Sequence, residues 1–211
     1  MYGDAPECVF LVCSNPGAGG DAALREWYED VHGPDALENG SFDSLHRYIA
    51  AGDYPARFLA VWEGRFTSMP EASAYISPRA AELRRAGRVT EDMTVVWASM
   101  QFRSSVTVRD PDAPVKTVTL VRGDATALAN MTELPDTKGA TYRYGDLLLI
   151  EHADDPEVVR REWRTIGNEG LAPEPYRPVF DVAGDDHVDA FRIEGTWVSH
   201  WTPISSLRAN R

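Results

Sequence analysis

The order of strand-like and helix-like segments constrains the fold of this chain more than any single motif. Apolar periodicity and turn residues define these segments. In residues 8–104 they are a strand at Cys8–Ser14, a helix and its exit at Gly19–Leu37, strands at Leu45–Ala51 and Arg57–Glu63, a helix from Ser68 to Gly87 that is interrupted near Ser77-Pro78, and a strand at Met93–Ser104. The resulting order, βαββαβ, is that of the ferredoxin-like unit.

The same order returns after a polar, proline-bearing linker at Arg109–Pro114. The segments are a strand at Val115–Arg122, a short helix at Asp124–Leu134, a hairpin of Thr141–Tyr144 and Leu147–His152, a helix that begins at Asp155-Pro156, and a strand or strands in Asp189–Ile204. We interpret this order as a diverged internal duplication. It predicts an α+β fold with two ferredoxin-like halves, residues 1–107 and 113–211.

The stretch Gly19–Leu37 carries the clearest helical pattern. Its apolar residues fall at i, i+3, i+4 and i+7 and form one face of a helix: Leu24, Trp27, Tyr28 and Val31. Asp21 is placed to cap the first turn, and Gly33-Pro34 predicts the end of the helix. His32 then lies in the last turn, one turn after Tyr28 and at the edge of the apolar face.

This stretch also resembles a known family. Residues 26–37, EWYEDVHGPDAL, are similar to the W-Y-x-x-x-H-x-P-x-x-L signature of small dimeric α+β barrel proteins, the EthD-like group. The resemblance continues through Leu45–Tyr48, Arg57–Trp62 and Ser77-Pro78, and covers roughly residues 7 to 104. The superfamily that it implies includes polyketide cyclases, cofactor-free monooxygenases, muconolactone isomerases, haem-degrading enzymes and haem-dependent dehydratases.

Proteins of this family bury the apolar face of one sheet by pairing two chains into a barrel. Because this chain carries both halves, the resemblance implies that it forms the dimeric α+β barrel intramolecularly, so that it is a monomer or a homodimer with other contacts. The second half has no match to Trp27, Tyr28 and His32. We therefore expect the functional pocket in the first half.

His32 is the leading candidate for a catalytic residue. Histidine titrates near neutral pH and can carry a proton, and Tyr28 can hold an oxygen of the substrate. The alternative is a purely structural histidine that stabilises the carboxyl end of the helix through its charge. His46, on the second strand, is the third catalytic candidate and would polarise the same oxygen as Tyr28.

The candidate substrate-binding residues are mostly aromatic or cationic: Trp27, Arg47, Tyr48, Trp97 and His200. Strand parity places His46 and Tyr48 on one face and Arg47 on the other. Arg47 would meet an anionic ligand or form a salt bridge at the rim. His200 would line a cavity of the second half or be a hydrogen-bonded core residue. The proline-rich segment Asn168–Asp189 is either a lid or plain cover.

Composition excludes several kinds of partner. The net charge of −12 argues against nucleic acid and anionic membranes. No apolar run is long enough for a membrane helix, and the first residues lack a signal-peptide pattern. Cys8 and Cys13 have opposite parity on one strand about 17 Å apart, so they cannot form a disulfide together, and a reduced, cytoplasmic setting fits them. The acidic segment at 184–189 indicates a solvated loop rather than a metal site.

These features predict a cofactor-independent enzyme that uses acid/base chemistry on a small, apolar carbonyl, phenolic or polyketide-like compound. The reaction would be a cyclisation, isomerisation, decarboxylation or dehydration. One alternative is a cofactor-free or haem-dependent oxygenase or dehydratase. Another is a protein that binds a small molecule without catalysis. No serine nucleophile elbow, catalytic cysteine motif or dinucleotide fingerprint is present.

Overall fold

The computed structural model describes residues 6–52, 54–108, 110, 112–123, 128, 139–166, 191–193 and 196–209. Its fold is mixed α+β, as predicted, and its strands pair in antiparallel fashion. The chain divides into two compact units. The N-terminal unit comprises residues 6–47, 57–102 and 204–211, and the C-terminal unit comprises 1–5, 48–56 and 103–203.

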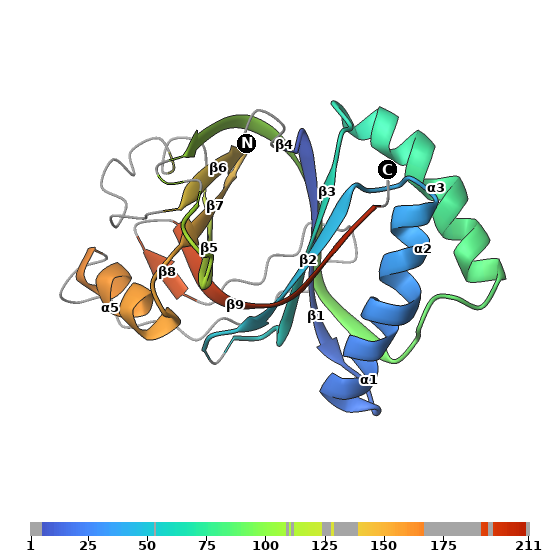
Figure 1. Ribbon diagram of the computed structural model, residues 1–211, viewed down its shortest axis with the longest axis horizontal. Coiled ribbons are helices and arrows are strands. Elements are labelled where there is room, and N and C mark those ends of the chain that lie inside the picture. The colour runs from blue at the N-terminus through green and yellow to red at the C-terminus, as the bar shows by residue number, and fades with distance from the viewer. Residues whose placement is uncertain are drawn as a thin grey trace. The chain divides into compact units, whose positions relative to one another are not determined.

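The N-terminal unit packs helices on one face of an antiparallel sheet (Figure 1). Its elements are β1 (Cys8–Pro16), α1 (Gly20–Glu26), the π-helix η1 (Trp27–His32), α2 (Gly33–Glu38), β2 (Ser44–Ala50), β3 (Phe58–Gly64), α3 (Met69–Arg85) and β4 (Met93–Val108). The strand order is β2-β3-β1-β4. The central strand, β1, pairs Leu11 with Val61 of β3 and with Ser99 of β4. The last residues of β2 and β4 belong to the C-terminal unit.

The first helical segment does not end at Gly33-Pro34, which corrects the sequence prediction. It continues through α2 to Glu38, and Pro34 stands in the first turn of α2. The π-helical turn explains why the proline is tolerated. There the N–H of Gly33 donates to the carbonyl of Tyr28, five residues back, so the register has already shifted before the residue that lacks an N–H. His32 therefore lies in the middle of a continuous helical segment rather than in its last turn.

The cap of α1 also differs from the prediction. Asp21 makes no capping hydrogen bond and instead pairs with Arg57 at 3.0 Å. The carboxylate of Asp92, just before β4, accepts from the backbone N–H groups of Ala18 and Gly19 at 2.6 and 2.8 Å. Asp21 was the expected cap because it lies next to the start of the helix in the sequence. The fold instead brings the carboxylate of Asp92, more than 70 residues away in the chain, to this position.

Helix α3 is uninterrupted, although the sequence predicted a break near Ser77-Pro78. Its start is as expected, because Ser68 accepts from the N–H of Glu71. Pro78 removes one backbone donor from the middle of the helix, and the guanidinium of Arg79 donates to the carbonyl of Tyr75 at 2.8 Å in the neighbouring turn. The helix ends before Gly87, whose φ of +68° is the left-handed conformation expected of a helix stop.

The C-terminal unit has the strand order β4-β6-β7-β5-β9-β8. Its elements are β5 (Thr117–Arg122), β6 (Ala140–Tyr144), β7 (Leu147–His152), α5 (Pro156–Ile166), β8 (Phe191–Ile193) and β9 (Thr196–Arg208). A buried cluster joins α5 to the strands through Val121, Leu128, Leu148, Ile150, Val159, Trp163 and Val198. Gly145, at φ +48°, turns the predicted β6–β7 hairpin. The segment Asn168–Asp189, and the helix predicted at Asp124–Leu134 apart from Leu128, lie outside the described residues.

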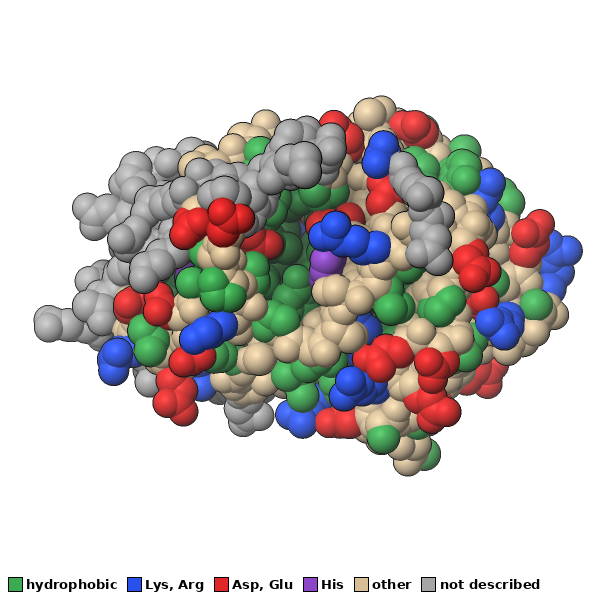
Figure 2. All heavy atoms as spheres, in the orientation of Figure 1, with side chains coloured by type: hydrophobic (Ala, Val, Ile, Leu, Met, Phe, Trp, Pro, Cys, Tyr) green, Lys and Arg blue, Asp and Glu red, His purple; other side chains and the backbone are tan. Residues whose placement is uncertain are grey.

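The surface carries both signs of charge. Figure 2 shows Asp and Glu side chains mixed with Lys and Arg over the helices of the N-terminal unit. In the part of the chain that the structure describes, no helix combines the length and apolar character needed to cross a membrane. Cys8 and Cys13 are both buried, and neither is in a disulfide.

Candidate active-site cavity

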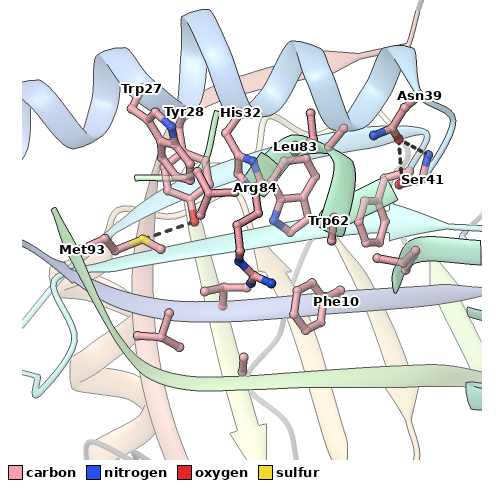
Figure 3. A pocket seen from close by; sticks show the side chains of 18 residues that line it. Phe10, Trp27, Tyr28, His32, Asn39, Ser41, Trp62, Leu83, Arg84 and Met93 are labelled. Atoms are coloured by element: carbon pink, nitrogen blue, oxygen red, sulfur yellow. Dashed lines mark hydrogen bonds between the residues drawn. The ribbon is translucent and has the colours of Figure 1, made fainter. Parts of the chain in front are cut away.

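The N-terminal unit contains a cavity of about 330 Å³ between its helices and its sheet (Figure 3). Aromatic and aliphatic side chains make up most of its wall. The lining residues are Phe10, Val12, Trp27, Tyr28, His32, Ala36, Asn39, Ser41, Phe42, Trp62, Ile76, Ala80, Leu83, Arg84, Val89, Met93, Val95 and Ala98. The volume lies at the lower end of the range of about 300–1,000 Å³ that is typical of small-molecule sites.

His32 lies against the wall of this cavity in a box of aromatic rings. Its imidazole stacks on Trp27, with ring centroids 4.4 Å apart and planes 9° apart, and meets the ring of Trp62 edge-on at 5.2 Å. Burial lowers the pKa of His32 to about 4, so the ring is neutral at pH 7. The Nδ1 atom is enclosed and has no hydrogen-bond partner among the described residues. The other ring nitrogen, Nε2, is not among these enclosed atoms.

Tyr28 stands one turn before His32 and is 2% exposed. Its hydroxyl donates to the thioether of Met93 at 3.8 Å, and a thioether sulfur is a weak acceptor. Burial raises the pKa of Tyr28 to about 12, although the nearby charge of Arg47 acts in the opposite direction. The phenol is thus protonated at neutral pH and is free to donate to a stronger acceptor.

Arg47 lies beneath the ring of Tyr28 and is 1% exposed. Its guanidinium carbon is 4.3 Å from the Tyr28 centroid and 5.3 Å from that of Phe58. None of its nitrogens has a hydrogen-bond partner among the described residues, and burial lowers its pKa. Arg47 neither lines the cavity nor forms the rim salt bridge considered from the sequence. It supports Tyr28 through a cation–π contact.

The polar residues of the cavity lie in two groups. Asn39 and Ser41 form one, in which the Asn39 side-chain oxygen accepts from both the N–H and the hydroxyl of Ser41 at 3.0 and 2.6 Å. These bonds leave the amide nitrogen of Asn39 as a donor. The other polar side chains of the lining are His32, Tyr28 and Arg84, and Arg84, from the last turn of α3, is exposed (Figure 3).

His46 does not line the cavity with His32 and Tyr28, although the sequence suggested that the three meet. Its Nδ1 bonds the hydroxyl of Ser206 at 2.8 Å, and its Nε2 lies 3.3 Å from the carboxylate of Glu63. Although burial opposes it, hydrogen bonding and charge from His46 help to lower the pKa of Glu63. Adjacent strand residues point to opposite faces, and Arg47 is the one that faces the helices.

Two other predicted binding residues also lie away from the cavity. Trp97 is buried but is absent from the lining. It pairs with Cys13 of β1, whereas Val95 pairs with Ser14, so that a bulge leaves Val96 without a pairing partner. This bulge places Trp97 on the opposite face of the sheet from Val95, which lines the cavity. Tyr48 belongs to the C-terminal unit.

His200 is a core residue of the C-terminal unit, which was one of the two sequence interpretations. It is fully buried and its Nδ1 lies 2.9 Å from the hydroxyl of Thr119, which is 2.8 Å from Nε2 of His152. Burial lowers the pKa of His152 to about 4. This histidine–threonine–histidine chain is a polar network inside the core.

Several residues of the wall were not predicted from the sequence. Phe10 and Trp62 come from paired positions of β1 and β3, and Arg84 follows an α3 stripe that contains Ile76, Ala80 and Leu83. The stripe has helical spacing and was a usable signal. The pairing of Phe10 with Trp62 depends on strand register, which the sequence does not specify.

Comparisons with known proteins are sparse. No family model and no curated protein matches the chain. Among solved structures, an anthrone oxidase-like protein matches with a TM-score of 0.51 and 11% sequence identity, over 100% of this chain and 96% of that chain. At this identity the similarity concerns the fold alone, and it agrees with the α+β class.

Proposed function

We propose that the cavity is the active site of a cofactor-independent enzyme that transfers a proton on a small, flat carbonyl or phenolic compound. The observation that carries the proposal is the state of His32 and Tyr28. Both border one aromatic cavity, and the protein gives their polar atoms weak partners or none. Buried polar groups are normally satisfied, and the hydroxyl of Tyr28 has only a weak acceptor among the described residues, so it is suited to bind a polar atom of a ligand.

In the proposed reaction the aromatic wall holds the flat ligand, and Nε2 of neutral His32 accepts a proton from an acidic C–H bond. The electron pair of that bond moves onto the neighbouring carbonyl, which becomes an enolate. The hydroxyl of Tyr28 donates to the new oxyanion, and the amide of Asn39 is a second possible donor from the other end of the cavity. Return of the proton to another atom would give an isomerisation or permit a cyclisation.

The strand orders support the finer architecture predicted from the sequence. The neighbouring strands are β2-β3-β1-β4 in the first set and β6-β7-β5-β9 in the second. In both sets the order across the sheet is therefore second, third, first and fourth strand along the chain. We therefore propose two ferredoxin-like halves that form an intramolecular dimeric α+β barrel. A monomer or homodimer and a cytoplasmic setting remain part of this proposal.

Anthrone is a suitable probe, because it is a flat ketone with acidic methylene protons and the name of the similar structure points to it. We would follow exchange of these protons in D₂O by NMR, under argon. The protein should accelerate exchange, and His32→Gln should lower that acceleration by about 10²–10⁴. His46→Gln is the matched control and should retain it. No acceleration over buffer, or full activity of His32→Gln, would refute the proposal.

A second candidate function is cofactor-free oxidation, which the name of the anthrone oxidase-like neighbour favours. The same enolate would react with O₂, so that anthrone and O₂ give anthraquinone and water. Oxygen uptake that depends on both the protein and His32 would identify this reaction. Binding of anthrone without exchange or oxygen uptake would instead indicate a binding protein.

Haem fits this cavity poorly. The volume of about 330 Å³ suits a smaller ligand, and in the described part of the lining Arg84 is the one cationic side chain for two propionates. One face of the His32 ring is also covered by Trp27. We therefore derive no step through haem, and the absorption spectrum of the purified protein should lack a Soret band.

A further inference from the structure

We infer that the ligand of the cavity is an acid, and that Arg84 pairs with its carboxylate or another anionic group. This inference rests on the proposed use of the cavity and adds the chemical class of its ligand. The ligand would be a flat aromatic or polyketide-like acid. Its rings would pack on the aromatic wall, and its anionic group would lie at the end of α3.

The first support is the composition of the wall. The chain has 33 acidic and 21 basic residues, yet no aspartate or glutamate lines the cavity among the residues that the structure describes. Within this described lining, Arg84 is the one cationic side chain, because His32 is neutral at pH 7. A single cation in an acid-free, apolar site favours anions over neutral or cationic ligands.

The second support is the state of Arg84 itself. Four other arginines of the N-terminal unit have carboxylate partners: Arg25 with Glu29, Arg57 with Asp21, Arg65 with Asp43 and Arg88 with Asp35. On α3 itself, Arg79 and Arg85 donate to backbone carbonyls, and the side chain of Arg84 is exposed. Arg84 has no ion pair and no hydrogen bond among the described residues. Its planar guanidinium can therefore bind a carboxylate through two parallel bonds.

Arg84 could instead have a purely structural role at the end of α3. Arg84 and Arg85 both lie in the last turn of α3, where a cation stabilises the helix dipole. The dipole acts equally on both residues, but only Arg84 reaches the cavity. Arg85 donates to the carbonyl of Ala81 at 3.3 Å. Arg85 is therefore a matched control with the same charge, the same helix and no cavity contact.

The test uses two dyes that differ in one anionic group. These are 1-anilinonaphthalene-8-sulfonate and its neutral parent, N-phenyl-1-naphthylamine, and fluorescence titration gives the dissociation constant of each. Arg84→Gln should weaken binding of the sulfonate about threefold to tenfold and leave the neutral dye unchanged, and added salt should reduce the difference. Arg85→Gln should change neither constant.

The site of dye binding is established by filling the cavity. Ala98→Trp should abolish binding of both dyes, and the smaller Ala98→Leu serves if the larger side chain prevents folding. If a folded Ala98 variant still binds the dyes, the dyes bind outside the cavity, and the inference is overturned. Equal effects of Arg84→Gln and Arg85→Gln, or no effect of either, would overturn it too.

This test is independent of the proposed catalysis. His32→Gln should keep the preference for the anionic dye even where proton exchange is lost. A protein that exchanges anthrone protons but shows no Arg84-dependent dye preference would keep the proposed function and lose the acid ligand. A protein that shows the Arg84-dependent dye preference but does not exchange anthrone protons would keep the acid-binding cavity and lose the proposed proton transfer.

Discussion

The imidazole of His32 lies face to face with the indole of Trp27, with ring centroids 4.4 Å apart and planes 9° apart. Such a stack encloses the histidine without giving its nitrogens an acceptor. It therefore favours the neutral ring, in agreement with a pKa lowered by burial to about 4. The stack holds the ring in one orientation at the cavity wall, which a proton carrier needs and a surface histidine lacks.

This depressed pKa makes stability depend on pH. The unfolded chain protonates His32 as the pH falls through about 6.5, whereas the folded protein resists until about 4. The contribution of neutral His32 to the free energy of unfolding is thus fully present above pH 6.5 and is lost as the pH falls toward 4. Between pH 7.5 and 5 the expected loss is about 2 kcal/mol from His32, and His152, with a pKa of about 4, adds a similar loss.

Urea unfolding at the two pH values measures this effect. Carboxylates also titrate in acid, so the informative quantity is the difference between the wild type and a variant. His32→Gln should lose about 2 kcal/mol less than the wild type on acidification. An unchanged pH dependence in His32→Gln would show that the histidine is already charged or exposed in the folded protein.

Much of the fold could be predicted from sequence because its elements are set by local patterns. The apolar run of β1 and the Gly145-Asp146 turn each specify their structure within a few residues. The mistakes arose where distant residues act. Pro34 is accommodated by a π turn that involves Tyr28, and the first helix is capped by Asp92 from the other end of the unit.

The site was predicted in part for the same reason. Trp27, Tyr28 and His32 share one helical stretch, and their common cavity follows from local spacing. The place of His46 could not be predicted, because parity alone says that it and Arg47 oppose each other, not which one meets the helices. Trp97 was misplaced by a bulge, which no pattern in its own strand reveals.

A second prediction concerns the buried charge of Arg47. Burying a guanidinium without a carboxylate is costly, and an apolar residue of similar shape often replaces such a group without loss. Arg47→Met should therefore leave the free energy of unfolding unchanged or raise it by about 1–4 kcal/mol. Arg47→Ala should lower it by about 2–5 kcal/mol, because it leaves a cavity beneath Tyr28. Chemical denaturation compares the two, and a strongly destabilised Arg47→Met would reveal a polar partner.

A third prediction concerns the cap supplied by Asp92. Its carboxylate accepts two backbone N–H groups before α1, and hydrogen bonds to a charged group contribute more than neutral ones. Asp92→Ala should lower the free energy of unfolding by about 1–2 kcal/mol. Glu91→Ala, which removes an exposed neighbouring charge, is the control and should change it by less than about 0.5 kcal/mol. Equal effects of the two substitutions would show that only net charge matters.

The last prediction separates the chemical role of Tyr28 from its structural role. Among the described residues its buried hydroxyl has only the thioether of Met93 as an acceptor, so Tyr28→Phe removes a poorly satisfied group and keeps the ring that stacks with Arg47. The thermal midpoint should stay the same or rise. Proton exchange on anthrone should nevertheless fall by about 10²–10³, the usual effect of removing one donor to a developing oxyanion. Tyr75→Phe, which loses a hydroxyl bonded to the Asn39 carbonyl and absent from the cavity lining, should keep full exchange. Full exchange by Tyr28→Phe would mean that the hydroxyl does not touch the reacting oxygen.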